Sequence, residues 1–335
     1  MAGGVKTKEL VFAGPRRIEI EEHLAPTLTG AQVLVQTWVS AISAGTELLL
    51  YRGEAPPDMQ ADGNLPALAG TLAFPLHYGY SAVGEVIALG PAASAELLGR
   101  TVFAFHPHAS QFPAAADELF PLPPDLPPEA GLFLPNMETA INFLHDGAPL
   151  AGERVVVFGQ GVVGLLTTAL LARTPLGTLI TVDPDPVRRA ISLEFGAGKS
   201  LAPSELEGLA EQADLSYELT GDAQALDQAI SVTGFEGRVV LGSWYGTKQA
   251  SLNLGGRFHR SRIRLLSSQV STIASTLTGR WDKRRRLEFA LQMVRAVEPT
   301  RLVTHRVPIE RAAEAYALLD THREHVLQVV LTYDS

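Results

Sequence analysis

The stretch from Ala41 to Gly53 ("AISAGTELLLYRG") places a hydroxyl and a carboxylate side by side in a small turn between apolar runs. Thr46 and Glu47 follow Ala44 and Gly45, two residues that contribute no functional group. A hydroxyl held beside a substrate oxygen can donate a hydrogen bond or pass on a proton. The turn therefore indicates part of a reaction site with Thr46 as its main functional group. The alternative is a hydroxyl that only stabilises the turn.

The glycine-rich run at 159–164 ("GQGVVG") has the spacing of a dinucleotide-binding loop. It follows a strand-like apolar run, opens a helix-like apolar run, and is followed 19 residues after its last glycine by Asp183. The first glycine permits the tight turn, the second lets the backbone approach a pyrophosphate, and the third allows close helix packing. The helix N-terminus favours the phosphate charge. The expected loop residues are Gly159, Gly161, Val162, Val163 and Gly164.

Asp183 bears on which dinucleotide is bound. A carboxylate at this position accepts hydrogen bonds from the adenosine ribose hydroxyls and repels a 2'-phosphate, so it favours NAD over NADP. Arg188 and Arg189 follow closely in the sequence, and an arginine can bind that phosphate. We expect NAD, with Arg188 among the cofactor contacts, and keep NADP as the alternative.

From residue 154 the sequence alternates strand-like and helix-like runs. This alternation predicts an α/β fold, a doubly wound parallel sheet covered by helices on both faces. Ligands of such sheets bind beyond the carboxyl ends of the strands, so the residues that end the later strands are expected to line the cofactor. These residues are Thr220, Gly221, Gly242 and Ser243. The run at 263–268 ("IRLLSS") is expected to be the outer strand.

The two ends of the chain have a different pattern. Residues 1 to about 120 alternate short β-branched runs with glycine and proline turns, which is typical of a compact β-rich domain. The run at 121–131 ("PLPPDLPPEAG") has too many prolines for a strand interior or helix core, which indicates a stiff crossing between domains. From about residue 270 the order becomes helix, strand, helix, strand.

With these parts in place, the whole chain resembles the medium-chain dehydrogenase/reductase superfamily. In its zinc-dependent members the first turn reads Cys-Gly-Thr-Asp, and here Ala44 replaces the metal-binding cysteine. A second signature, Gly-His-Glu, appears as Gly79-Tyr80-Ser81, so Tyr80 replaces the histidine ligand. The third ligand falls near Leu134 or Pro135, neither of which binds a metal. The resemblance thus implies the zinc-type fold without zinc.

The same resemblance implies a domain division and further site residues. It predicts a GroES-like β-rich catalytic domain at 1–138 and 270–335 and a Rossmann domain at 139–269. It also implies that Thr46 relays a proton, that Thr139 lies near the nicotinamide, and that two copies pair through the edge of the Rossmann sheet as a homodimer. Local runs such as "FAFHPHAS" and "GSWYGT" resemble a subgroup that includes bacteriochlorophyllide dehydrogenase and threonine-dehydrogenase-like proteins.

Without a metal, other groups must stabilise charge on the substrate oxygen. We expect Thr46 and Tyr80 to donate hydrogen bonds and His77, near Tyr80 in sequence, to exchange protons with solvent. The alternative for Tyr80 is that it is an ordinary core aromatic residue with no role in catalysis. His106 and His108 are two residues apart, so both rings point to one face of an extended chain. They are predicted substrate contacts, and the alternatives are a metal site with His77 or ordinary packed or surface residues.

The run at 281–286 ("WDKRRR") bears on the substrate. It places four cations in the first turn of a helix capped by Asp282. Because the helix dipole disfavours cations at that end, a nearby anion would explain the arrangement. One interpretation is an anionic substrate that contacts Trp281 and Arg284. The other is a set of surface arginines paired with acidic residues.

Composition excludes several classes. There is no cysteine, hence no disulfide and no thiolate metal site. The formal net charge of −9 argues against a general nucleic-acid binder. The N-terminus has no secretory h-region, so we expect the cytoplasm. The uncharged run at 155–172 is near the lower length limit for a membrane span, but three glycines interrupt it, so we expect no membrane partner.

These observations predict an NAD(H)-linked, zinc-independent oxidoreductase that acts on a secondary alcohol or ketone, which can be anionic. A second interpretation is an NADPH-linked quinone or enoyl reductase. A third, from another class, is an NAD(H)-binding protein that has lost catalysis together with its metal ligands. Turnover of any alcohol would eliminate the third.

Overall fold

The computed structural model describes residues 6–209, 212–322 and 324–334. The chain divides into two compact units, Met1–Pro135 with Glu298–Ser335, and Asn136–Val297. We call these the first and the second unit. Residues 270–297 belong to the second unit, whereas the sequence analysis placed them with the β-rich domain. The proline-rich run at 121–131 lies inside the first unit and is not the crossing.

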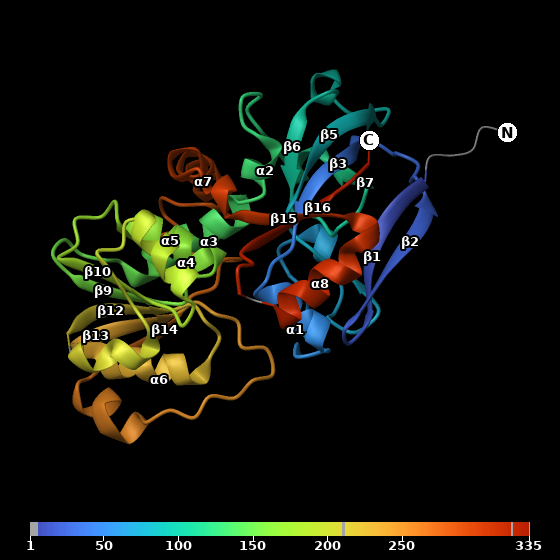
Figure 1. The fold of residues 1–335 in the computed structure, drawn as a ribbon. Helices are drawn as coiled ribbons and strands as arrows, with labels where there is room; N and C mark the ends of the chain where they lie inside the picture. The colour runs from blue at the N-terminus through green and yellow to red at the C-terminus, as the bar shows by residue number, and fades with distance from the viewer. Residues whose placement is uncertain (1–5, 210–211, 323, 335) are drawn as a thin grey trace. The chain divides into compact units, whose positions relative to one another are not determined.

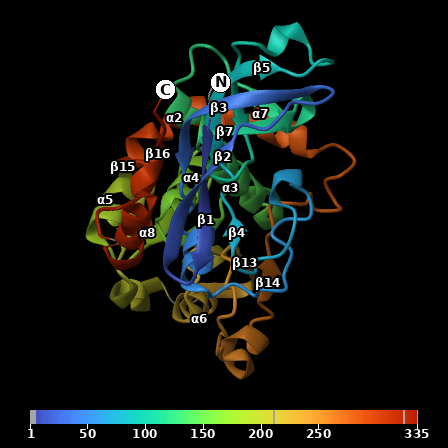
Figure 2. The same cartoon turned by 90° about the vertical axis from the view of Figure 1, so that its right-hand side faces the viewer.

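The first unit is built from two sheets. The larger has the order β15-β16-β3-β5-β6-β8, with β7 paired to β3. Its strands are β3 (Gln32–Ala41), β5 (Ala82–Leu89), β6 (Thr101–Ala104), β7 (Gln111–Ala115), β8 (Leu119–Pro121), β15 (Val303–Pro308) and β16 (Gln328–Thr332). The smaller sheet has the order β2-β1-β4, formed by β1 (Lys6–Gly14), β2 (Arg17–Leu24) and β4 (Leu76–His77). Figure 2 shows β1 and β2 side by side as a long antiparallel hairpin. The predicted β-rich domain is confirmed.

Three α-helices belong to the first unit: α1 (Thr46–Arg52), α2 (Pro128–Gly131) and α8 (Ala312–Thr321). Helix α1 ends at Gly53, whose φ of +72° suits glycine because it has no Cβ. Helix α8 lies beside α1 (Figure 1), and its Tyr316 ring contacts Phe12 and Tyr51 at centroid distances of 5.3 and 5.5 Å. The C-terminal part of the chain thus packs onto the turn that carries Thr46.

The second unit has one parallel sheet of order β11-β10-β9-β12-β13-β14. Its strands are β9 (Arg154–Phe158), β10 (Thr178–Val182), β11 (Lys199–Leu201), β12 (Ala213–Glu218), β13 (Thr233–Leu241) and β14 (Arg264–Ser267). Strand order reverses between β9 and β12, and β14 is an edge strand. This is the predicted doubly wound parallel sheet with the predicted outer strand. Pairing of two copies through β14 stays a prediction.

Helices cover both faces of the sheet (Figure 1). Both faces are apolar because successive side chains along β9 point to opposite sides. Val155 and Val157 face one side and pack with Phe143, and Val156 and Phe158 face the other. The helices of this unit are α3 (Leu134–Gly147), which begins just before the boundary, α4 (Val162–Leu171), α5 (Pro186–Glu194), α6 (Ala223–Val232) and α7 (Lys283–Val297). Burying one such side chain stabilises the fold by about 1.5–3 kcal/mol.

The uncharged run at 155–172 forms strand β9, the glycine-rich turn and helix α4. Throughout the described parts of the chain, every helix is too short or too polar to cross a bilayer. The prediction of a strand, a tight turn and a buried helix is therefore confirmed for this run.

Helix α7 explains why residues 270–297 belong to the second unit. Asp282 caps the helix as predicted, because its Oδ1 accepts a hydrogen bond from the Arg285 N–H at 2.7 Å. Arg286 is fully buried and donates to Glu138 of α3 from Nε at 3.0 Å and from Nη2 at 2.9 Å. A third bond joins Arg286 Nη1 to Asn142 Oδ1 at 2.5 Å. The anion that offsets the charge of Arg286 is therefore a carboxylate of the protein.

Candidate functional site

The glycine-rich loop has the backbone that its sequence predicts. Gly159 has a φ of +89°, and a Cβ there would lie 2.9 Å from the carbonyl oxygen of Leu219. A Cβ on Gly164 would lie 1.9 Å from the carbonyl oxygen of Gly159. A Cβ on Gly161 would meet only the tip of the Arg188 side chain, at 4.0 Å, and α4 begins directly after it at Val162. The loop backbone is thus open to approach where a pyrophosphate would meet the helix N-terminus.

Asp183 lies just beyond β10 and is 4% exposed. One carboxylate oxygen accepts the Gln160 N–H at 2.7 Å, and the other accepts the Asp185 N–H at 2.9 Å. Each oxygen has a second lone pair, which can accept a ribose hydroxyl. Asp183 therefore fixes the glycine-rich loop and still has the chemistry that binds a ribose.

The two nearby arginines are held by the protein in different ways. Arg189 donates to the carbonyl oxygens of Asp183 and Pro184 at 2.9 and 2.8 Å. Arg188 forms an ion pair with Asp185 at 3.7 Å, and its Nη1 lies 4.0 Å from where a Cβ on Gly161 would be. Of the two, Arg188 is the one whose guanidinium lies near the loop. Its predicted contact with the cofactor stays a prediction.

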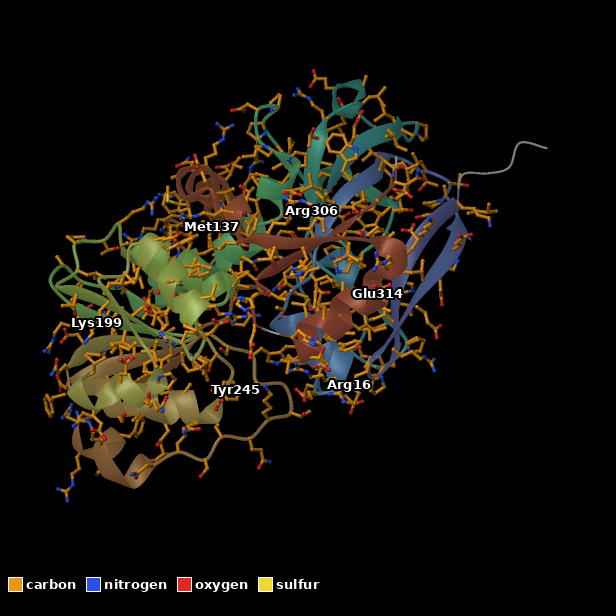
Figure 3. All side chains as sticks on the ribbon, in the orientation of Figure 1. Arg16, Met137, Lys199, Tyr245, Arg306 and Glu314 are labelled. Carbon is orange, nitrogen blue, oxygen red and sulfur yellow. The ribbon has the colours of Figure 1, made fainter. Side chains whose placement is uncertain are left out.

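The predicted cofactor-lining residues at the ends of β12 and β13 gather around Glu218. Its Oε1 accepts the Thr220 N–H at 2.6 Å and the Gly221 N–H at 3.0 Å, and it also accepts the Thr220 hydroxyl. Tyr245, labelled in Figure 3, donates to Glu218 Oε2 at 3.2 Å. Burial raises the pKa of Glu218, against the lowering effect of these hydrogen bonds. Ser243 and Gly242 follow the adjoining strand. Thr139 lies on α3.

Thr46 and Tyr80, the two predicted donors, belong to a cluster of three hydroxyls. Tyr80 precedes β5 and donates to Ser43 Oγ at 2.5 Å. Thr46, at the start of α1, hydrogen-bonds the same phenol through its side chain. Burial raises the pKa of Tyr80 to about 12, aided by the negative charge of Glu47 and opposed by the hydrogen bond with Ser43. The phenol is therefore a proton-bearing donor at neutral pH.

The positions that match metal ligands in the zinc-dependent members offer none here. Ala44 is exposed, while Leu134 and Pro135 are buried apolar residues. Ser81 donates its hydroxyl to the carbonyl oxygen of Leu132 at 2.8 Å. Within the described ranges, no group of three or more His, Asp or Glu side chains is arranged to hold a metal ion.

The three predicted histidines have separate surroundings. His77 is exposed and pairs with Glu9 at 3.4 Å. His106 stacks on Phe112 at a centroid distance of 3.9 Å, and burial lowers its pKa to about 4. His108 is fully buried and is hydrogen-bonded through both ring nitrogens. His106 is thus neutral at pH 7, and His108 belongs to the interior of the first unit.

The remaining predicted substrate contacts lie on the second unit. Trp281 contacts His145 at a centroid distance of 4.4 Å, and the Arg285 guanidinium lies 4.2 Å from the Trp281 ring. These residues border an open cavity of about 400 Å³. The Arg284 side chain is 85% exposed and pairs with Glu288 at 3.1 Å. This pairing favours the surface interpretation for Arg284. The substrate roles of Trp281 and Arg284 stay predictions.

Sequence reasoning gave no role to Glu47, Ser43 or Glu218. Glu47 carries a signal in hindsight, because a lone carboxylate followed by four apolar residues on a helix is placed to be buried. Glu218 ends a buried strand two residues before the predicted Thr220, which places it at the same carboxyl end of the sheet. Ser43 carries no such signal.

The chain was compared with known proteins. No protein-family model matches the sequence. It is 24% identical over 343 residues to 2-desacetyl-2-hydroxyethyl bacteriochlorophyllide A dehydrogenase of Cereibacter sphaeroides, covering 93% of this chain and 94% of that protein. It is 23% identical over 209 residues to galactitol 1-phosphate 5-dehydrogenase of Escherichia coli K12, covering 59% of this chain. That match spans only 58% of the relative's own length.

Solved structures share the fold over nearly the full length. An Escherichia coli alcohol dehydrogenase complexed with NADH matches with a TM-score of 0.78 at 17% identity, covering 98% of this chain and 100% of the other. A zinc-binding dehydrogenase of Sinorhizobium meliloti bound to NADP matches with a TM-score of 0.78 at 17% identity, covering 98% and 99%. The relatives and neighbours are dehydrogenases of the zinc-type alcohol dehydrogenase-like kind.

Proposed function

We propose that this chain, which has the fold and the relatives of the medium-chain dehydrogenase/reductase superfamily, is an NAD(H)-linked, zinc-independent oxidoreductase acting on a secondary alcohol or ketone. One observation carries the proposal: hydroxyl donors Tyr80, Ser43 and Thr46 form a cluster at the positions that match a metal cradle. Arg284 and Arg286 of α7 are paired with carboxylates of their own unit, whereas the Arg285 guanidinium lies over the Trp281 ring. The substrate of the proposed reaction can therefore be neutral or anionic.

The second unit supplies a fitting site for a nicotinamide dinucleotide. Gly161 leaves room for the pyrophosphate, and the lone pairs of Asp183 suit two ribose hydroxyls. A dinucleotide held there would supply the hydride for reduction of a ketone, or the hydride acceptor for oxidation of an alcohol. The residues of this chain bind and orient the dinucleotide through the loop and fix the charge next to its ribose.

The first unit supplies the groups that act on the substrate oxygen. The Tyr80 hydroxyl keeps its proton at neutral pH, because its pKa is raised to about 12. It can therefore donate to an oxygen on which negative charge develops. Thr46, hydrogen-bonded to the same phenol, can pass the proton on. A zinc ion does not fit this cradle, because Ala44 and Leu134 have no donor atom and the phenol resists deprotonation.

The cofactor preference tests the proposal. Titration of the protein with NADH and NADPH, followed by fluorescence, should give the lower Kd for NADH. Asp183→Asn removes the charge that repels a 2'-phosphate but keeps one acceptor oxygen. This substitution should lower the ratio of the NADPH Kd to the NADH Kd about tenfold, or about 1.4 kcal/mol. Elemental analysis of the same sample checks for metal.

Other outcomes would select the alternative functions. A preference of the unchanged protein for NADPH would favour the quinone or enoyl reductase, for which Arg188 near the loop is the supporting feature. Stoichiometric zinc would contradict the metal-free mechanism. Tight NADH binding without turnover of any secondary alcohol or ketone would favour a binding protein that has lost catalysis.

A further inference from the structure

Glu47 is a buried acid that the proposed function leaves without a role. It lies one residue after Thr46, and its side chain is fully buried in the first unit. Placing a carboxylate in the interior is costly unless several donors compensate it. The number and origin of its donors therefore show what Glu47 connects.

Three donors converge on this carboxylate, one from its own turn and two from distant segments. Glu47 Oε1 accepts the Ser43 N–H at 2.9 Å, which closes the turn on itself. Glu47 Oε2 accepts from His108 Nε2 at 3.0 Å and from the hydroxyl of Tyr316 on α8. Burial, together with the charge of Glu47, raises the pKa of Tyr316, so this phenol is a donor only. Glu47 thus ties the turn to two other parts of the first unit.

His108 extends the connection to the segment that carries Tyr80. The His108 N–H donates to the carbonyl oxygen of Tyr78 at 3.3 Å. Its ring packs on Gly79 so closely that a Cβ there would lie 2.8 Å from His108 Cδ2. Gly79 has a φ of +132°, which also favours glycine. His108 therefore contacts the two residues before Tyr80 on one side and Glu47 on the other.

The far side of the His108 ring is fixed as well. His108 Nδ1 lies 2.7 Å from the Ser40 hydroxyl, and Ser40 Oγ lies 2.7 Å from the Tyr333 hydroxyl. Ser40 is in β3, and Tyr333 follows β16. With both ring nitrogens engaged and the ring packed on Gly79, His108 has one orientation. It behaves as a rigid link between the turn and the Tyr80 segment.

We propose that Glu47 and His108 are positioning residues, a buried cross-link that holds Ser43 and Thr46 at hydrogen-bonding distance from the Tyr80 hydroxyl. The expected effect of this cross-link on catalysis rests on the proposed function. Its effect on the position of the Tyr80 hydroxyl rests on the contacts alone. In the zinc-dependent members a shared metal ion would join the turn that carries Thr46 to the segment that carries Tyr80. Here the cross-link joins these two segments.

The test compares Glu47→Gln with the unchanged protein. Glutamine keeps the size of the side chain but loses the charge and presents an N–H group to a donor. We expect kcat for an active ketone to fall roughly tenfold to a hundredfold, because small displacements of reacting groups are costly. The Kd for NADH should not change. The pKa of Tyr80 should fall, because the nearby negative charge is gone.

The pKa of Tyr80 is measured by pH titration of tyrosinate absorbance. For each protein, the titration curve of the same protein carrying Tyr80→Phe is subtracted. The matched control is Glu218→Gln, which alters an equally buried carboxylate of the second unit and should leave the Tyr80 titration unchanged. If Glu47→Gln does not fold, Tyr316→Phe removes a single donor and is measured instead.

A folded Glu47→Gln or Tyr316→Phe protein with unchanged kcat and unchanged Tyr80 titration would overturn the inference. If the unchanged protein turns over no alcohol or ketone, the proposed function fails, and the Tyr80 titration still decides the cross-link. A fall in stability without a change in that titration would also overturn it, because it would assign Glu47 a purely structural role.

Discussion

Tyr80→Phe should lower kcat about 10²- to 10³-fold, with little change in the Kd for NADH. This is the cost of removing one donor aimed at charge that develops in the transition state. Phenylalanine keeps the ring, and the turn loses the hydrogen bonds of Ser43 and Thr46 with the phenol. The measurement is steady-state turnover of the best ketone or alcohol found by screening, with the Kd for NADH measured on the same preparation.

Tyr78→Phe is the matched control for this prediction. Tyr78 is buried, and its ring meets that of Tyr80 edge to face at 6.3 Å, so its substitution perturbs the same packing. Its hydroxyl is not part of the cluster with Ser43 and Thr46, and kcat should stay within a few-fold of the original. Equal losses in the two variants would show that packing, and not the Tyr80 hydroxyl, governs turnover.

Arg286→Met should lower the free energy of unfolding of the second unit by about 3–5 kcal/mol, the usual cost of removing one partner of a buried ion pair. Glu138 is 2% exposed, so solvent does not replace the guanidinium without local opening. The substitution also removes the hydrogen bond to Asn142, which further weakens the contact between α7 and α3. Urea unfolding at pH 7, followed by tryptophan fluorescence, measures the change.

The double variant Arg286→Met with Glu138→Gln separates the effect of the buried charge from that of the lost packing. Because the second substitution neutralises the Glu138 carboxylate, it should recover at least half of the stability lost. Arg284→Met, which removes an exposed ion pair on the same helix, should cost no more than about 1 kcal/mol. A double variant as unstable as the single one would mean that the charge of Glu138 is not the cause.

Local patterns were sufficient to predict much of the second unit. The glycine spacing at 159–164 and the alternation of strands and helices depend on neighbours in the sequence, and the structure has both. The Asp282 cap was predictable for the same reason. What failed was the assignment of residues 270–297, because the partner of Arg286 lies 148 residues away in the sequence.

The hydroxyl cluster was predictable only in part. Thr46 and Tyr80 were found because their positions match those of a known family, but Glu47 was left unexplained. Its donors His108 and Tyr316 are 61 and 269 residues distant, and no periodic pattern reports such a contact. His106 and His108 have different partners, which their two-residue spacing does not reveal. One stacks on Phe112 and the other is enclosed by Glu47 and Ser40.

The division of the chain has a consequence for its synthesis. The second unit is continuous, whereas the first needs β15, β16, Tyr316 and Tyr333, which leave the ribosome last. The first unit therefore begins to emerge from the ribosome before the second but is completed after it. This differs from the usual order, in which the N-terminal domain folds first during synthesis. Nascent chains stalled after residue 297 and fully extruded should carry a protease-resistant second unit and a protease-sensitive stretch at 6–135. Equal resistance of both would show that the early strands are stable without their C-terminal partners.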